Sequence, residues 1–320
     1  MTEEQGLVSW LGRVAVSYTG ADDSGPTSLV IKLAPRDPAR RESAANFRIF
    51  EREVCIYRDL AAVGAIPAPT CYFAALSADG REFALLLEDL SDFPLGDDLR
   101  GLDADQAGIV TTALAEMHRS WWEAPALDTA GSLLEVAAWH RRVEAFSDYW
   151  PSFLDGFGNL IPADARRFGP ACAGTMHRLL DELSARPVTL VHGDLKPSNL
   201  FFPAGAVKMI DWQFAGRHPG AWDMSYLLAI GLPVEERRKL EWGLLHTWHE
   251  RLGPEVRGSY SYQHAVSDYR RSAVMTCLVN PVVGSQHLDL SRPTAKACFC
   301  ASVTNRFVAA LDLGLDDVLL

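Results

Sequence analysis

One stretch of this 320-residue chain, LVHGDLKPSNLFFPAGAVKMIDWQF at residues 190–214, constrains the fold more than any other. Two short apolar runs, at 188–191 and 207–210, flank a turn-forming segment, a pattern typical of short buried strands. Each run ends on an acidic loop, the first at Asp194 and the second at Asp211. The pattern predicts two carboxylates at the ends of neighbouring strands.

A third polar side chain stands close to these carboxylates. Asn199 follows Asp194 by five residues, so a loop that curls back presents a carboxylate and an amide oxygen to the space where Asp211 points. Oxygen ligands of this kind suit Mg²⁺ that also binds the phosphates of a nucleotide. One of the two carboxylates is then left to act as a base, which is the division of roles that phosphoryl transfer needs.

Composition and charge limit the class of protein. With 48% apolar and 22% charged residues the chain is ordinarily globular, and it is long enough for one bilobed domain or two packed ones. The formal net charge of -11, without a long basic stripe, argues against a nucleic-acid partner. No signal peptide and no apolar run long enough to cross a bilayer are visible, so we expect a cytoplasmic protein without a membrane partner.

The first part of the chain predicts two hairpins separated by one helix. Alternating and β-rich runs predict strands at 13–18, 27–33, 70–76 and 82–87. Apolar residues at spacings of three and four predict a helix over 41–63, with Phe47 and Phe50 on its apolar stripe.

Lys32 and Glu53 are the notable charges in this part. Glu53 stands among apolar neighbours of the predicted helix, where a carboxylate is costly unless a positive charge meets it. Lys32, near the end of the second strand, is the simplest candidate for this positive charge. An ion pair with Glu53 would hold the lysine toward a nucleotide's phosphates. The alternatives are a solvated lysine on an edge strand and a solvated glutamate at the helix rim.

The rest of the chain predicts a mainly helical lobe. A change of composition near residue 90 divides the chain into a nucleotide-binding lobe at 1–90 and a helical lobe at 91–320 that holds the catalytic loop and the substrate pocket. Asp103 can cap the first of these helices. The predicted helices are 103–122, 133–149, 162–184, 222–230, 234–252, 260–279 and 294–313. The tryptophans of these helices fit a buried core better than a substrate pocket.

The motifs LVHGDLKPSNLFF and MIDWQFAGRHPGAWDMSYLLA resemble those of the aminoglycoside phosphotransferase and choline kinase superfamily, in particular its ecdysteroid kinase-like branch. Weaker motifs, SLVIKL, FEREVCIY and FALLLEDL, follow in the expected order, so the resemblance covers nearly the whole chain. It implies an α+β, protein-kinase-like, two-lobed fold. A small N-terminal antiparallel sheet with one helix would precede a large helical lobe, with ATP between them.

The resemblance also implies a role for each site residue. Asp194 matches the catalytic base, and Asn199 with Asp211 the magnesium ligands. Lys32 matches the phosphate-binding lysine and Glu53 its helix partner. The remaining matches are Lys196, which could reach the transferring phosphoryl group or be a solvated loop residue, and main-chain groups near Glu88 and Leu90, which would pair with adenine.

Two further residues of the motifs have structural interpretations. His192 fits a packed residue better than a second acid or base. Asp223 could cap the helix after Gly220, and the family pattern suggests that it also braces the catalytic loop.

Three departures from protein kinases shape the prediction. Gly193 stands in place of arginine, and no long activation segment follows Asp211, which argues against a protein substrate. Trp212-Gln213 replaces Phe-Gly, as in small-molecule kinases. The phosphate-covering loop would fall at residues 5–9, with a single glycine, and the strand before it is expected to be missing.

Together these observations predict an ATP- and Mg²⁺-dependent phosphotransferase acting on a hydroxyl of a small molecule. The alternatives are a catalytically silent kinase-like protein that binds a nucleotide or another ligand, and an antibiotic-modifying phosphotransferase. The sequence discloses neither the acceptor nor the oligomeric state.

Overall fold

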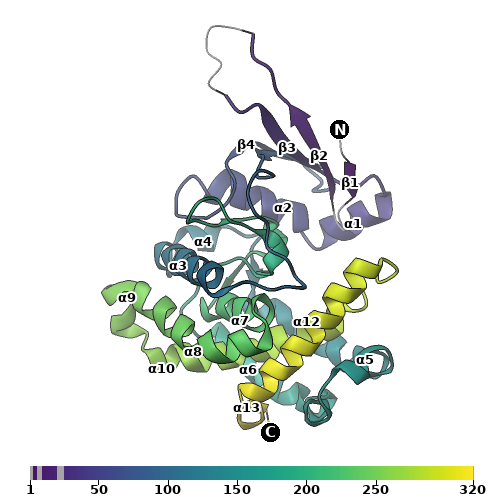
Figure 1. The fold of residues 1–320 in the computed structure, drawn as a ribbon, viewed down its shortest axis with the longest axis vertical. Helices are drawn as coiled ribbons and strands as arrows, with labels where there is room; N and C mark the ends of the chain where they lie inside the picture. The colour runs from purple at the N-terminus through teal and green to yellow at the C-terminus, as the bar shows by residue number, and fades with distance from the viewer. Residues whose placement is uncertain (1–2, 6–8, 20–24, 320) are drawn as a thin grey trace.

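A five-stranded antiparallel sheet forms the small lobe at one end of the molecule (Figure 1). The computed structural model describes residues 3–5, 9–19 and 25–319. The strands follow the order β1-β2-β3-β5-β4. Their bounds are β1 Glu3–Gln5, β2 Trp10–Ala15, β3 Ser28–Leu33, β4 Cys71–Leu76 and β5 Phe83–Glu88. Lys32 therefore lies on the central strand and not on an edge.

The prediction that the first strand is missing is wrong. β1 pairs antiparallel with β2, Glu3 opposite Gly12 and Gln5 opposite Trp10, and it forms the edge of the sheet. Three residues are too few for a periodic signal, which is why the sequence pattern did not predict this strand. Most of the predicted phosphate-covering loop lies outside the described residues.

The single helix predicted over 41–63 is interrupted. α1 (Pro38–Asn46) ends before Arg48, which takes a left-handed conformation with φ 54°, and α2 (Ile49–Val54) continues into a π-helical turn at Cys55–Leu60. Phe47, predicted to be on the apolar stripe, is 66% exposed because it lies at this break. Phe50 faces the sheet, and its ring stacks on Phe83 at 4.3 Å between centroids. The break turns α2 so that Phe50 joins the hydrophobic core and Glu53 is buried.

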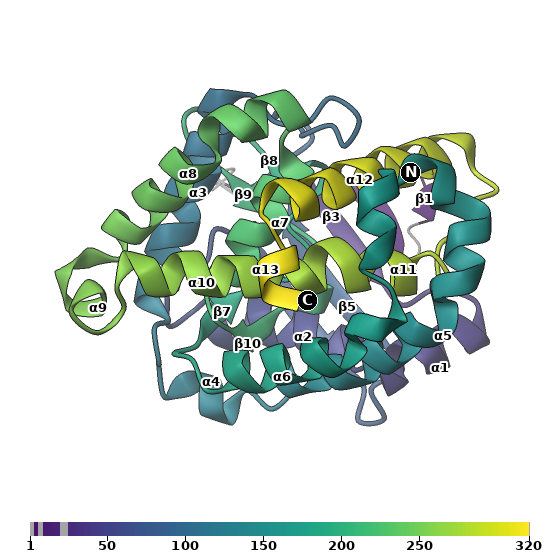
Figure 2. The same cartoon turned by 90° about the horizontal axis from the view of Figure 1, so that it is seen from below.

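The large lobe is mainly helical, as predicted, and carries a small three-stranded sheet and a two-stranded one (Figure 2). Its α-helices are α3 Ala104–Ser120, α4 Ala126–Thr129, α5 His140–Phe157, α6 Ala173–Ser184, α7 Ala221–Gly231, α8 Val234–Arg251, α9 Gly253–Ser259, α10 Tyr262–Ala273, α11 Asn280–Gly284, α12 Pro293–Asp312 and α13 Asp316–Leu319. Its strands are β6 Leu134–Glu135, β7 Thr189–Val191, β8 Leu200–Phe201, β9 Lys208–Met209 and β10 Gly216–His218.

Local signals explain where several of these helices begin and end. Asp103 and Gln106 form a reciprocal capping box that begins α3, as the sequence predicts. The prediction of one helix over 162–184 is wrong, because short 3₁₀ turns occupy its first part and α6 begins only at Ala173. The predicted helix over 133–149 likewise begins later, at His140, after β6 and a 3₁₀ turn.

The core runs from the small lobe through α3 into the helices of the large lobe. α7 is buried along its whole length, so it is the central helix of the large lobe. Trp121, Trp139, Trp150 and Trp248 belong to this core, whereas Trp242 is exposed. No helix within the described ranges is both long and apolar enough to span a bilayer.

Candidate active site

The catalytic loop begins where β7 ends, and a buried carboxylate holds it in place. The main-chain N–H groups of His192 and Gly193 donate to the two oxygens of Asp223, at 2.7 and 2.9 Å. Asp223 is fully buried in the first turn of α7. Asp223 therefore braces the loop, one of the two structural interpretations that the sequence allows.

A relay of hydrogen bonds supports Asp223 in turn. Trp248 Nε1–H donates to His118 Nδ1 at 2.9 Å, which leaves the proton of this neutral imidazole on Nε2, 3.3 Å from Asp223 Oδ2. Burial alone would raise the pKa of the Asp223 carboxyl, but the contacts with His118 and the loop hold this pKa below its ordinary value. The brace is therefore a charged group that the loop requires.

Gly193 takes a backbone conformation that suits no other residue here. Its φ is +79°, and a Cβ at this position would overlap the carbonyl oxygen of Phe214. The departure from the arginine of protein kinases thus has a local cause: the loop passes directly against the segment after Asp211.

His192 is a structural residue. Its Nε2–H donates to the carbonyl oxygen of Ile210 at 2.9 Å, and its Nδ1 accepts the main-chain N–H of Asp194 at 3.2 Å. Both ring nitrogens are used to join the catalytic loop to the strand before Asp211, so neither is left for acid or base chemistry.

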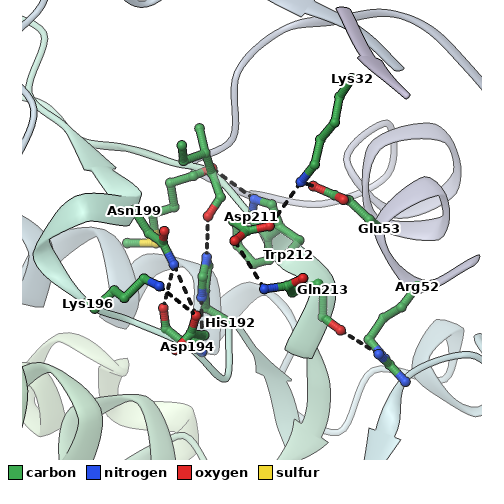
Figure 3. Close-up of polar contacts among 12 residues, drawn as sticks. Lys32, Arg52, Glu53, His192, Asp194, Lys196, Asn199, Asp211, Trp212 and Gln213 are labelled. Carbon is green, nitrogen blue, oxygen red and sulfur yellow. Dashed lines mark hydrogen bonds and ion pairs between the residues drawn. The ribbon is translucent and has the colours of Figure 1, made fainter. Parts of the chain in front are cut away.

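Asp194, Lys196 and Asn199 lie together on the curled loop (Figure 3). Asn199 Nδ2 donates to the main-chain oxygen of Asp194 at 2.8 Å and lies 3.4 Å from Asp194 Oδ2. Lys196 Nζ lies 3.6 Å from the same carboxylate oxygen. The Asp194 carboxylate raises the pKa of the Lys196 ammonium, so this lysine stays charged beside the candidate base.

Asp211 meets the small lobe at the end of the second short strand. Its backbone is left-handed, with φ 67°, which turns the side chain toward Lys32. Lys32 Nζ lies 2.9 Å from Oδ1, and Gln213 Nε2 donates to Oδ2 at 3.1 Å. Burial would raise the pKa of the Asp211 carboxyl, but Lys32 and Lys196 outweigh burial and lower it.

Lys32 and Glu53 form the ion pair that their sequence context predicts. Lys32 Nζ lies 2.7 Å from Glu53 Oε1, and the two residues are 7% and 1% exposed. The alternatives of a solvated edge lysine and a solvated rim glutamate are therefore wrong. Burial lowers the pKa of the Lys32 ammonium, but Asp211 and Glu53 more than offset it and raise this pKa above its ordinary value.

Glu88 and Leu90 lie at the end of β5, where the chain leaves the sheet. The main-chain N–H of Glu88 already donates to Thr70, and its carboxylate accepts from the main-chain N–H of Thr70 and from Lys208. The carbonyl of Leu90 accepts the N–H of Phe93. If adenine pairs with main-chain groups here, as predicted, it must therefore use atoms other than the Glu88 N–H.

The donor set fits a magnesium–nucleotide complex. Because Asn199 Nδ2 is held by Asp194, its Oδ1 is the amide atom left for a ligand. The carboxylates of Asp194 and Asp211 supply hard oxygens, while Lys32 and Lys196 supply positive charge for phosphates. Within the described residues no cluster of three or more His, Cys, Asp or Glu side chains could hold a metal ion.

Sequence reasoning missed one contributor to the site. Arg52, 3% exposed, donates to the carbonyl oxygens of Ser132 at 3.0 Å, of Phe47 at 3.1 Å and of Gln213. Burial lowers the pKa of this guanidinium to about 10. Its only sequence signal is a place directly before Glu53, because its partners are main-chain carbonyl groups, two of them remote in the chain.

The comparisons place the chain in a family. Residues 14–260 match the phosphotransferase enzyme family, and the chain belongs to it. No curated protein matches its sequence. A choline/ethanolamine kinase family protein from Mesorhizobium loti has a similar structure, with a TM-score of 0.54 and 15% identity over 98% of this chain and 88% of the other.

Two further solved structures carry the same likeness. An amicoumacin kinase in complex with AMP-PNP, Ca²⁺ and Ami gives a TM-score of 0.55 at 13% identity, covering 97% of this chain and 87% of the other. A GDP complex of an aminoglycoside 2'-phosphotransferase gives 0.52 at 13% identity, covering 98% and 90%. At these identities the likeness establishes the fold, and the protein-kinase-like, two-lobed α+β prediction is confirmed.

Proposed function

We propose that this chain is an ATP- and Mg²⁺-dependent small-molecule kinase that phosphorylates a hydroxyl group. The observation that carries the proposal is the convergence of Asp194, Lys196 and Asn199 on one side of Asp211, with Lys32 on the other (Figure 3). The family membership and the similar structure with AMP-PNP and Ca²⁺ support it.

Each residue has a role in this reaction. Asp194 orients the acceptor hydroxyl and takes its proton as the hydroxyl oxygen bonds to the γ-phosphorus and the bond to the ADP oxygen breaks. Asn199 and Asp211 would hold Mg²⁺, which neutralises phosphate charge when bound. Lys32, held by Glu53, binds the phosphates, and Lys196 stabilises negative charge on the transferred group.

Replacement of the base tests the proposal. Asp194→Ala should lower turnover by roughly 100-fold to 10,000-fold, because a positioned base contributes that much. Calorimetric titration with ATP and Mg²⁺ should still show binding, since Lys32, Asn199 and Asp211 remain. Asp92→Ala, which removes an exposed carboxylate, is the matched control. Equal turnover by Asp194→Ala and wild type would refute the assignment of the base.

Two finer assignments stay predictions. The ecdysteroid kinase-like branch and a cytoplasmic location rest on sequence patterns alone. The division at residue 90 also stays a prediction, supported by the end of β5 at Glu88. A panel of hydroxylated metabolites, sterols and antibiotics, scored by ATP consumption, would separate a metabolic from an antibiotic-modifying kinase.

A further inference from the structure

On the large-lobe side of Asp194 a network of polar side chains joins four elements. Arg142 of α5 donates through Nη1 to Asn280 Oδ1 of α11 at 3.1 Å. Asn280 Nδ2 donates to the hydroxyl of Tyr226 in α7 at 2.8 Å. The guanidinium of Arg306, in α12, lies 5.4 Å from the centre of the Tyr226 ring. The network thus brings two arginines to one buried phenol.

Arg142 lies beside the candidate active site. Its guanidinium is 5.8 Å from the ring centre of Phe214, the third residue after Asp211, and 4.8 Å from that of Trp139. Burial lowers the pKa of Arg142, and the Asp194 carboxylate is close enough to oppose this change. Burial also raises the pKa of the Tyr226 phenol, and Asp194 contributes to that rise as well. Asp194 is therefore within electrostatic range of the network.

In the described part of the chain no carboxylate forms an ion pair with Arg142 or Arg306, and Asp194 acts on Arg142 only through longer-range attraction. The hydrogen bonds of Arg142 and Arg306 go to uncharged oxygens of Asn280, Ser302 and Thr276. A buried cation without an anionic partner is costly. Asp98, an acidic residue near Lys196, does not supply an anionic partner for these arginines. Both of its carboxylate oxygens accept hydrogen bonds from Ser198.

An acceptor must place its hydroxyl at Asp194, with the rest of the molecule on the large-lobe side, since Lys32 and Asp211 occupy the phosphate side. We propose that this acceptor is a hydroxylated carboxylic acid whose carboxylate pairs with Arg142. Guanidinium and carboxylate form bidentate hydrogen bonds that fix both orientation and distance. A cationic acceptor would instead meet the like charge of Arg142. The inference rests on the proposed function and specifies its substrate class.

Matched acceptor pairs test this inference. Wild type, Arg142→Gln and the control Arg141→Gln would be assayed with gluconate against glucitol, and with 4-hydroxybutyrate against 4-amino-1-butanol. Arg141 is exposed on the same helix, so both variants lose one charge from α5. We expect wild type to prefer the acids. Arg142→Gln should lower kcat/KM for the acids roughly 10- to 100-fold, mainly through KM, because a hydrogen bond to a charged group is lost.

The controls separate this inference from a structural role and from the proposed function. Arg142→Lys keeps the charge and should recover part of the acid preference, which a purely structural role would not predict. If wild type phosphorylates a neutral or amino alcohol but no acid, or prefers the amino alcohol to the acid, the inference is wrong while the proposed function stands. If ATP does not bind, the proposed function fails. Carboxylate binding is then tested separately by the shift of the melting temperature with gluconate, and equal shifts in wild type and Arg142→Gln would overturn the inference.

Discussion

At the scale of single residues, the site depends on backbone geometry as much as on side-chain chemistry. Gly193 and Asp211 both have positive φ, and both lie where the two short strands end. The left-handed conformation costs a residue with a Cβ about 1–2 kcal/mol. Asp211 bears that cost and gains contacts with Lys32 and Gln213, whereas Gly193 avoids it.

Gly193→Ala should be far more damaging than the same change at another glycine with positive φ. Gly205, with φ +73°, has nothing within 4 Å of an added Cβ, so Gly205→Ala measures the backbone cost alone, about 1–2 kcal/mol. In Gly193→Ala the methyl group also overlaps the Phe214 carbonyl, which must shift the loop. Urea denaturation should show a larger loss of unfolding free energy for Gly193→Ala, with turnover lost; equal losses would contradict this account.

Asp223→Asn should destabilise the protein in a pH-dependent way. The amide oxygen of the new side chain would accept a hydrogen bond from one of the two loop N–H groups, but its NH₂ group would face the other N–H, which then has no acceptor. We expect the unfolding free energy to fall by about 3 kcal/mol at pH 7. Because the pKa of Asp223 is below its ordinary value, its stabilisation is present above the unfolded-state pKa and is lost as pH falls through the folded pKa.

Urea denaturation at several pH values checks this sign. The difference in unfolding free energy between wild type and Asp223→Asn should be largest near neutral pH and shrink below about pH 4. The control Asp105→Asn changes an exposed carboxylate in the first turn of α3. A difference that grows on acidification would show that Asp223 does not act as a charged brace.

At the scale of elements, Arg52 joins α2 to the large lobe. It lies next to Glu53, whose carboxylate pairs with Lys32. The Arg52 guanidinium donates to the carbonyls of Ser132 and Gln213, so it connects α2 to the segment that carries Asp211. The position of α2 and the geometry of the phosphate site are therefore coupled by one side chain.

Arg52→Met should therefore impair the phosphate site without removing any predicted ligand. A displacement of Asp211 by about 1 Å would lower turnover on the order of 100-fold. The Mg²⁺ concentration for half-maximal activity should rise, because Asp211 is the residue displaced. Arg58→Met, on an exposed arginine paired with neighbouring Asp59, is the control. An unchanged Mg²⁺ dependence in Arg52→Met would rule out this coupling.

The sequence predicted those parts of the site whose signal is local. Asp194, Asn199 and Asp211 are set by a short spacing, and Glu53 was recognisable as a carboxylate on an apolar face. Arg52 was missed because its acceptors are main-chain carbonyls up to 161 residues away. The break at Arg48 was missed because a non-glycine residue there takes a left-handed conformation that no composition signal marks.

At the scale of the whole molecule, β1 and α13, the first and last described elements, lie in different lobes. In Figures 1 and 2 the N-terminal end of α12 reaches toward β1 of the small lobe. Contacts across the lobes also include Lys32 with Asp211 and Lys208 with Glu88, both ion pairs. A ligand that binds Lys32, Asn199 and Asp211 at once would add to this set.

Such a ligand should stabilise both lobes together. ATP with Mg²⁺ at 100 times its dissociation constant should add about 2.7 kcal/mol to the unfolding free energy. Lys32→Met removes the proposed phosphate contact and leaves Glu53 and Asp211 without their cationic partner, so the shift of the melting temperature with ATP and Mg²⁺ should be largely lost. Arg81→Met, an exposed cation of the same lobe, is the control. If the wild-type protein gains no stability at millimolar ATP and Mg²⁺, the result would instead favour a catalytically silent protein. The ion pair of Lys32 with Asp211 would then join the two lobes without a nucleotide.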